Sequence, residues 1–558
     1  MNRPFPDTQR AIQLVGPGQV VFNEQKPVFA PRSRQILCSV EAVGLCFSDL
    51  KLLRQFASHP RKSEIVAGID ERVLRELPSY VPGDRPTVPG HEAAVRVWAV
   101  GEEVERFRPG ERYLVQTDYR WLRTAQANAA FGYNLEGALQ EYVLLDERLI
   151  TSPAGEVLML PASEALSASA IALIEPWACV EDAYATRERR GVKEEGEMLV
   201  VADEDVPINR FVGLWREWGR PGHITWVCPR PVPDGLGVPF ARAVDAEAVA
   251  EASCDDVVYF GASPERAELL FCKLRAGGLF NIVCCGRRFG RPVTVPVGRV
   301  HYGGIRIVGT SGHDPGQSMQ SIPCSGEIGA GARVQVVGAG GPMGMMHVVR
   351  DLCLGAPGVQ LFACDTDEVR LRWLSRIAEP LAREQGAHFR AYNPAEEVPR
   401  ERFDYVILMV PVPGLVAQAV EEAAPRAIIN IFAGIPADVS AEIDLDSYLE
   451  KQLYFIGTSG SVLEDMRAVL ARVEAGRLDT DLSVAAVSGL EGAQEGLRAI
   501  AERRLAGKIV VYPGCRGLGL VALEDMQEKL PAVAELLDGG RWNRRAEKAL
   551  WEAWGQQR

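Results

Sequence analysis

The chain has 558 residues, of which 47% are hydrophobic and 24% charged, and its formal net charge at pH 7 is −13. This composition is ordinary for a soluble globular protein, and the length exceeds that of one typical domain. The acidic balance argues against a nucleic-acid partner, and the absence of an apolar run of about 18 residues argues against a membrane span. Residues 1–7 lack the apolar core of a signal peptide, so we expect a cytoplasmic protein with reduced cysteines.

The N-terminal third of the sequence is typical of a β-rich unit. Short apolar runs such as residues 35–40 and 94–100 are separated by Gly and Pro turns. Within this unit, Cys46, the pair His91 and Glu92, and Glu175 stand in separate short contexts. A thiolate, an imidazole and a carboxylate form a plausible protein shell for a catalytic zinc ion, with one position left open. No CxxC pair, which would suggest a closed structural site, is present in the sequence.

From about residue 195 the pattern changes to apolar strands that alternate with helical segments, which indicates βαβ units and a parallel sheet. This pattern occurs twice. Residues 256–259 match residues 404–407 at an offset of 148, residues 278–283 match residues 427–432 at 149, and residues 307–312 match residues 455–460 at 148. Three matches in the same order at a nearly constant offset predict a duplicated domain.

Only the second copy carries the features of a nucleotide-binding loop. A strand at residues 334–337 runs into a glycine-rich turn and a helix, and Asp365 ends the next strand. The residues expected to bind the cofactor are Gly338, Gly340, Gly341, Pro342, Met343, Gly344 and Asp365. The glycine spacing predicts a loop one residue longer than usual or a shifted first turn, and the carboxylate of Asp365 favours NAD over NADP.

The first copy lacks both features. Its strand at residues 198–201 leads into Ala202, Asp203, Glu204 and Asp205, where there is no glycine and the acidic side chains would repel a pyrophosphate. The following strand, residues 224–229, ends without an acidic residue. We interpret this copy as a structural Rossmann-like domain without a nucleotide loop.

Four phrases in this order resemble the medium-chain dehydrogenase/reductase family, in particular its zinc-dependent alcohol, polyol and threonine dehydrogenases. They are GLCFSDLK (44–51), VPGHEAAV (88–95), GALQEYV (137–143) and LIEPWA (173–178). Within the family, FGYNLEGALQEYV (131–143) and GAGGPMG (338–344) are most similar to sugar-alcohol enzymes, including L-sorbose-1-phosphate reductases.

The resemblance implies an α/β fold: a GroES-like β-barrel catalytic domain plus two tandem Rossmann-like parallel-sheet domains, of which the first is an addition to the family architecture. The expected segments are 1–190 (catalytic), 191–323 (first Rossmann-like copy), 324–465 (NAD-binding copy), 466–514 (return to the catalytic domain) and 515–558 (helical tail). Zinc and nicotinamide would meet in a cleft between the catalytic and nucleotide-binding domains.

The resemblance also assigns roles to residues around the metal. Cys46 and His91 fall on zinc ligands, and Glu175 falls where other members use a second Cys or a Glu. Glu92 falls on the glutamate beside the metal, which either coordinates it or assists exchange, so the third ligand stays open between Glu92 and Glu175. Ser48 corresponds to the hydroxyl group that passes the substrate proton outward, and Asp49 to a carboxylate just outside the ligand set. Because no Cys lies between Cys46 and Cys179, we expect one catalytic zinc and no structural zinc.

These expectations lead to a zinc-dependent enzyme that transfers a hydride between NAD(H) and a secondary alcohol or ketone of a polyol, sugar or sugar phosphate. One alternative is a redox-neutral epimerase or lyase that uses tightly bound NAD and the same metal site. Another is a non-catalytic, nucleotide-sensing scaffold. The additional Rossmann-like copy suggests a monomeric pseudo-dimer, in which it imitates a partner subunit; a homo-oligomer is the other prediction.

Overall fold

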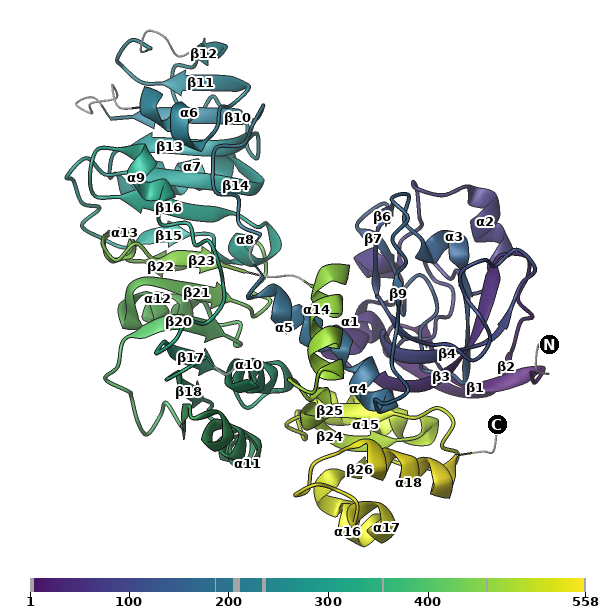
Figure 1. Ribbon diagram of the computed structural model, residues 1–558. Helices are drawn as coiled ribbons and strands as arrows, with labels where there is room; N and C mark the ends of the chain where they lie inside the picture. Colours follow the sequence, from purple (N-terminus) through teal and green to yellow (C-terminus); the bar gives the residue numbers. More distant parts are fainter. Residues whose placement is uncertain are drawn as a thin grey trace. The chain divides into compact units, whose positions relative to one another are not determined.

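The computed structural model describes residues 5–185, 187–203, 211–232, 237–353, 356–457 and 460–555. The chain forms two compact units (Figure 1): unit 1 contains residues 1–181 and 461–558, and unit 2 contains residues 182–460. Unit 1 is therefore assembled from both ends of the chain. In the part of the chain that the structure describes, no helix combines the length and apolarity needed to cross a bilayer.

Unit 1 is built around one curved mixed sheet, which among the described residues runs in the order β26-β24-β25-β3-β4-β5-β9, with β8 also paired to β3. The hairpins β1–β2 and β6–β7 stand beside it. The strands of unit 1 are β1 (Thr8–Gly16), β2 (Gln19–Pro27), β3 (Gln35–Gly44), β4 (Glu92–Val100), β5 (Arg112–Val115), β6 (Asp118–Arg123), β7 (Asn128–Ala130), β8 (Tyr142–Asp146), β9 (Met159–Pro161), β24 (Val484–Ser488), β25 (Lys508–Val511) and β26 (Val521–Ala522).

The helices of unit 1 come from both parts of the chain. They are α1 (Phe47–Gln55), α2 (Glu71–Glu76), α3 (Glu147–Ile150), α4 (Ala168–Ala172), α5 (Ile174–Asp182), α14 (Leu463–Glu474), α15 (Ala493–Ala501), α16 (Met526–Lys529), α17 (Pro531–Ala534) and α18 (Arg544–Trp554). The register of β25 against β3 joins the two parts, since Val510 pairs with Gly44 and Val511 with Val43. This pairing brings the C-terminal segment next to the strand that precedes Cys46.

Unit 2 contains two parallel sheets. Within the described residues, the first sheet has the order β12-β11-β10-β13-β14-β16 and the second the order β19-β18-β17-β20-β21-β23. The elements of the first half are β10 (Glu197–Ala202), α6 (Val212–Trp218), β11 (His223–Val227), β12 (Phe240–Arg242), β13 (Cys254–Phe260), α7 (Pro264–Lys273), β14 (Leu274–Val283), β15 (Val293–Val295), α8 (Val297–Tyr302), β16 (Arg306–Thr310) and α9 (Pro315–Met319).

The second half repeats this arrangement. Its elements are β17 (Arg333–Val337), α10 (Pro342–Cys353), β18 (Gln360–Cys364), α11 (Glu368–Gln385), β19 (His388–Tyr392), β20 (Phe403–Leu408), α12 (Pro413–Glu422), β21 (Ala423–Ile431), β22 (Ala441–Ile443), α13 (Leu445–Glu450) and β23 (Tyr454–Ile456). In both sheets the first strand along the chain is central and the order reverses beside it, which is the doubly wound arrangement of nucleotide-binding domains. The predicted fold class is confirmed, including the duplicated parallel sheet.

The two sheets of unit 2 share a hydrophobic core and meet through equivalent elements. The short strands β15 and β22 pair in the antiparallel direction, with Thr294 opposite Glu442. These two residues are themselves 148 positions apart, so they are equivalent positions of the two copies. Thr294 Oγ1 donates a hydrogen bond to Glu442 Oε1 at 2.8 Å. An antiparallel pair centred on two equivalent residues is the geometry of an approximate two-fold axis.

Candidate active site

Three of the predicted metal ligands come together in unit 1. One ligand atom each from Cys46, His91 and Glu92 lies within 4.8 Å of the other two. Cys46 follows β3 and precedes α1, and His91 stands directly before β4. Because β3 and β4 are antiparallel with Gly44 opposite Glu92, the residues just beyond these strand ends face each other. A thiolate, an imidazole and a carboxylate at this spacing fit the donor set of a zinc ion.

Glu92 carries one buried oxygen that is paired and one that is not. The residue is fully buried, and its Oε1 lies 2.5 Å from Lys508 Nζ. Among the described residues, Glu92 Oε2 has no hydrogen-bond partner. A Cβ atom on Gly44 would lie 2.0 Å from this oxygen, so the carboxylate packs against backbone that only glycine leaves open. Because buried carboxylate oxygens normally have partners, the unpaired Oε2 beside a thiol and an imidazole fits a metal ion.

Asp49 accepts hydrogen bonds from the two segments that carry Cys46 and His91. Its carboxylate is 1% exposed, accepts a hydrogen bond from the Cys46 N–H at 2.9 Å and accepts another from the Gly90 N–H at 3.3 Å. Its Oδ1 also lies 3.3 Å from His91 Nδ1. Among the described residues this contact does not meet hydrogen-bond geometry, but a carboxylate so close to Nδ1 favours a metal on the other ring nitrogen, Nε2. Gly90 has a φ of +93°, which favours glycine at this turn.

Ser48 lies beside the cluster at the start of α1. Its Oγ is 3.4 Å from Cys46 Sγ, and the residue is partly exposed. A hydroxyl that contacts the ligand cluster on one side and solvent on the other has the placement that a proton relay requires.

Glu175 is buried near the cluster but is not one of the three clustered ligands. It lies in the first turn of α5 and is 8% exposed. Burial raises the pKa of Glu175 to about 7; the carboxylates of Glu92 and Asp118 act in the same direction, and His91 opposes them. The geometry therefore favours Glu92 over Glu175 as the third ligand and leaves Glu175 as a neighbouring carboxyl group.

Two residues of this site were not singled out by the sequence reasoning. Lys508, on β25, is 5% exposed; burial disfavours its charge, but the nearby Glu92 carboxylate raises its pKa above the ordinary value. Tyr133 is buried with its ring centroid 5.6 Å from that of His91, and the Arg61 guanidinium lies 5.3 Å from the same ring. A lysine in an apolar strand is the one sequence signal for Lys508, since buried lysines are normally paired.

The glycine-rich turn of unit 2 follows β17 and resolves the spacing of the loop. Gly338 has a φ of +82°, which makes the turn. A Cβ atom on Gly340 would lie 2.9 Å from Asp365 Oδ2, and a Cβ atom on Gly344 would lie 2.5 Å from the Gly338 carbonyl oxygen. Gly338 thus makes the turn, Gly340 lets the backbone approach Asp365 closely, and Gly344 lets the helix pack against the end of the strand. The loop has one more residue than usual before this last glycine. The helix α10 begins at Pro342 and includes Met343. A Cβ atom on Gly341 would lie 3.9 Å from the Gly338 carbonyl oxygen, an ordinary contact distance.

Asp365 stands where a ribose-binding acid is expected, directly after β18. Its Oδ2 accepts a hydrogen bond from the Gly340 N–H at 3.0 Å, and its Oδ1 accepts one from the Asp367 N–H at 3.1 Å. The carboxylate is therefore oriented by the loop itself. These residues fit a dinucleotide, whose pyrophosphate would approach the free N–H groups at the start of α10.

The equivalent place in the first copy is occupied by an acidic side chain. Asp203 follows β10, and its carboxylate accepts a hydrogen bond from the Tyr259 hydroxyl at 3.2 Å and lies 3.6 Å from Arg287. A Cβ atom on Gly261 would lie 2.2 Å from the same carboxylate. Glu204 and Asp205 lie outside the described residues, as do Thr458 and Ser459 of the repeated phrase. The described part of this copy thus lacks the glycine turn of the second.

The comparisons with known proteins agree with this architecture. Residues 32–154 match the family model of the alcohol dehydrogenase GroES-like domain. This match assigns an alcohol dehydrogenase GroES-like domain to the N-terminal part of the chain. It is 29% identical over 231 residues to the L-sorbose 1-phosphate reductase of Klebsiella pneumoniae, a match that covers 38% of this chain and 53% of that protein.

A second relative is the uncharacterized protein YggP of Escherichia coli (strain K12), 26% identical over 246 residues, or 40% of this chain and 57% of that protein. The chain therefore spans little more than half the length of these two relatives. Among solved structures, 2R,3R-butanediol dehydrogenase from Bacillus subtilis superimposes with a TM-score of 0.51 at 15% identity, covering 91% of this chain and all of that chain. This likeness establishes the fold.

Proposed function

We propose that the protein is a zinc- and NAD-dependent oxidoreductase that interconverts a secondary alcohol and a ketone of a polyol, sugar or sugar phosphate. The observation that carries the proposal is the cluster of Cys46, His91 and Glu92, in which a buried carboxylate oxygen is left without a partner among the described residues. The glycine turn that ends against Asp365 on the same chain supports a nicotinamide cofactor. The named reductase relative supports a sugar-related substrate.

Each residue of the site would have a separate role in such a reaction. When bound, zinc would act as a Lewis acid on the substrate oxygen, and the nicotinamide would supply or accept the hydride. Cys46, His91 and Glu92 would hold the metal, and Asp49 would orient the imidazole through Nδ1. Ser48, which contacts the Cys46 thiol and is partly exposed, would carry the hydroxyl proton of the substrate to solvent.

The proposed preference for NAD over NADP rests on Asp365. Its carboxylate is held by two backbone N–H groups, so it cannot turn away without losing both hydrogen bonds. An anionic group at this position would accept hydrogen bonds from ribose hydroxyls and repel a 2′-phosphate.

Metal analysis and a substrate panel test the function together. The purified chain should contain about one zinc ion, and NADH should form with at least one member of a panel of polyols, sugars and sugar phosphates. Cys46→Ala should lose both the metal and turnover. Cys272→Ala, at an exposed free thiol of unit 2, is the matched control and should keep both. Full turnover by Cys46→Ala would refute the metal mechanism.

We further propose that the first Rossmann-like copy serves as an internal counterpart of the second, so that the chain is a monomeric pseudo-dimer. The antiparallel β15–β22 pair, centred on Thr294 and Glu442, supports an approximate two-fold relation inside one chain. Tyr448 adds a hydrogen bond from its hydroxyl to the Ile307 carbonyl oxygen at 3.0 Å. An interface already made within the chain leaves the same elements unavailable to a second copy.

Light scattering of the eluting protein tests this arrangement. The expected mass is that of one chain, 61.0 kDa. A stable species of twice that mass, unchanged by dilution, would contradict the pseudo-dimer without bearing on the catalytic proposal.

A further inference from the structure

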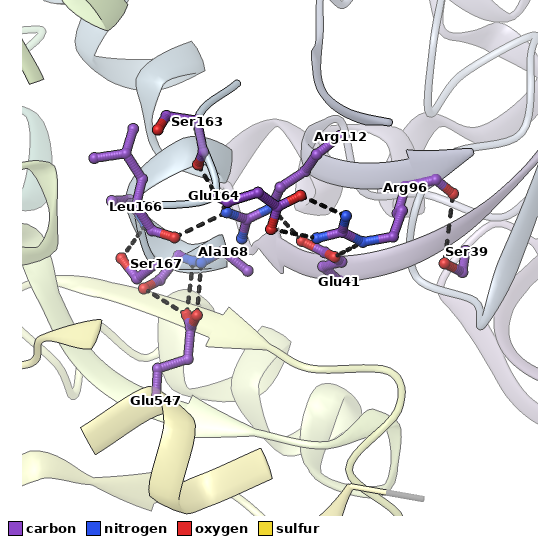
Figure 2. A network of polar contacts seen from close by, with 12 residues as sticks. Ser39, Glu41, Arg96, Arg112, Ser163, Glu164, Leu166, Ser167, Ala168 and Glu547 are labelled. Atoms are coloured by element: carbon purple, nitrogen blue, oxygen red, sulfur yellow. Dashed lines mark hydrogen bonds and ion pairs between the residues drawn. The ribbon is translucent and has the colours of Figure 1, made fainter. Parts of the chain in front are cut away.

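The C-terminal helix α18 carries a carboxylate that is buried among backbone and hydroxyl donors. Glu547 is 6% exposed. Its Oε1 accepts a hydrogen bond from the Ala168 N–H at 2.6 Å, and its Oε2 accepts one from the Ser169 N–H at 2.9 Å. Oε2 also accepts from the Tyr512 hydroxyl at 2.9 Å. It lies 3.1 Å from the Ser169 hydroxyl, whose single proton has a shorter contact, 2.6 Å, with Asp481 Oδ1. Figure 2 shows the carboxylate pointing at the backbone of Ala168.

Of the two elements that Glu547 contacts, one leads to the carboxyl group beside the metal cluster and the other to the partner of Glu92. The first is α4, which is separated by Leu173 alone from α5 and its buried Glu175. The second is the end of β25, where Tyr512 follows the strand that begins with Lys508, the partner of Glu92. One carboxylate therefore joins the helix that leads to Glu175 and the strand that holds Glu92.

The strand β25 also contacts the backbone next to Cys46. The Leu45 N–H donates to the Ile509 carbonyl oxygen at 2.9 Å, one residue before Cys46. A displacement of β25 would therefore move Lys508 and the backbone next to Cys46 together.

A second set of contacts in Figure 2 connects the segment before α4 with the strand β3. Arg112 Nη1 donates to the carbonyl oxygens of Ser163 at 3.1 Å and Leu166 at 2.8 Å. Arg112 Nε donates to Glu41 Oε2 at 2.5 Å, and Glu41 lies on β3, the strand that precedes Cys46. Arg112 thus holds the segment before α4, and Glu547 holds the first two residues of α4.

The tail is held in place by a buried tryptophan. Trp542 is 1% exposed, and its Nε1–H lies within hydrogen-bond distance of the Ser169 hydroxyl, at 3.1 Å, and of the Tyr512 hydroxyl, at 3.0 Å. These are the two residues that also donate to Glu547 Oε2. Trp542 and the Glu547 carboxylate therefore contact the same two residues, Ser169 and Tyr512.

We propose that Glu547 is a positioning residue for the metal centre, through which the C-terminal helix fixes the spacing between α4–α5 and β25. The inference rests on the proposed function, because it presupposes that the cluster binds a metal. Residues outside a ligand set that hold ligands or their partners in place typically change metal affinity when replaced, because coordination tolerates only small displacements. Glu547 touches neither metal nor substrate and acts through Lys508 and Glu92.

The test compares metal binding by full-length variants with their thermal stability. Glu547→Gln keeps the side-chain volume but replaces one acceptor oxygen with a donor, and Tyr512→Phe removes the hydroxyl that links β25 to the tail. Zinc affinity is measured by competition with a chromophoric chelator at a temperature where every variant is folded. The visible spectrum of the Co²⁺-substituted protein reports the coordination geometry. Glu552→Gln is the control, since Glu552 lies on the same helix, is exposed and is 3.8 Å from Lys548.

Glu547→Gln is expected to weaken zinc binding about tenfold or more and to change the Co²⁺ spectrum, with a smaller effect in the same direction for Tyr512→Phe. Glu552→Gln should match the wild-type protein. Lower thermal stability of Glu547→Gln and Tyr512→Phe with wild-type affinity and spectrum would overturn the inference, because the tail would then stabilise the fold only. Absence of metal binding by the wild-type protein would instead refute the proposed function, and with it this role of Glu547.

Discussion

Replacing Lys508 with methionine tests whether the buried ion pair holds Glu92 in place. Lys508 is 5% exposed, Glu92 is fully buried, and their charged atoms are 2.5 Å apart. At this distance the Coulomb attraction is about 7 kcal/mol for an effective dielectric constant of about 20. The cost of burying both charges offsets much of it while both are present, but methionine leaves the carboxylate with neither oxygen paired among the described residues.

Removing one partner of a buried pair typically costs about 3–5 kcal/mol, and we expect Lys508→Met to lose this much stability in the metal-free protein. Replacing both partners, as in Lys508→Met with Glu92→Gln, should restore most of it, because no unpaired charge remains. Because the chain has two compact units, unfolding is followed by hydrogen exchange of the β4 and β25 amides as well as by denaturant titration.

Lys529→Met is the matched control. Lys529 forms an exposed pair with Asp525 at 2.8 Å in the same unit, and its replacement should have a far smaller effect. Equal destabilisation by Lys508→Met and Lys529→Met, or no recovery in the double variant, would refute the assignment of Lys508 as the partner that keeps Glu92 charged and in position.

Three further predictions concern the nucleotide loop and the surroundings of the metal cluster. Gly344→Ala places a Cβ atom 2.5 Å from the Gly338 carbonyl oxygen. The substitution should therefore lower the free energy of unfolding by about 1–3 kcal/mol and weaken NADH binding in a fluorescence titration. Gly414→Ala, where a Cβ atom meets open space, should leave the stability and the NADH affinity unchanged. Asp365→Asn removes a charged acceptor worth about 1.5–3 kcal/mol, so NAD affinity should fall at least about tenfold while NADP affinity falls less; an unchanged ratio of the two would contradict the role of Asp365. Burial and, next, Arg61 lower the pKa of His59 from 6.5 to about 4. The unfolded chain therefore binds more protons between these values, and wild-type stability should fall as pH drops from about 6.5 to 4. His59→Gln should flatten this part of a stability–pH curve, and a superimposable curve would show that His59 is not its source.

The strongest sequence inferences concerned features that are encoded within a few neighbouring residues. The duplicated sheet was predicted from phrases at a nearly constant offset, and the two observed sheets have equivalent strand orders. The glycine turn was recognised, but its register stayed open because spacing alone does not say which glycine makes the turn. The positive φ of Gly338 and the packing of Gly344 against it decide this point.

The candidate metal site was less completely defined by the sequence, because the choice among its predicted ligands depends on distances across the fold. Cys46 and His91 stood out by their short contexts, and the pairing of β3 with β4 brings them together. The sequence favoured Glu175 as the third ligand, with Glu92 beside the metal, and left the choice between them open. The structure groups Glu92 with the other two ligands because it begins β4, whereas Glu175 lies on α5 beside them.

The sequence by itself determined the chemistry available to this protein: a thiol, an imidazole and carboxylates for a metal, and a glycine turn with an acidic residue for a dinucleotide. Such features are local, since a backbone turn or a donor type needs only its own residues. Only the tertiary structure decided which groups support the site. Lys508 reaches Glu92 across 416 residues of sequence, and Glu547 reaches Ser169 across 378. These contacts depend on the pairing of β25 with β3 and on the docking of α18, and both bring together chain ends that no local pattern connects.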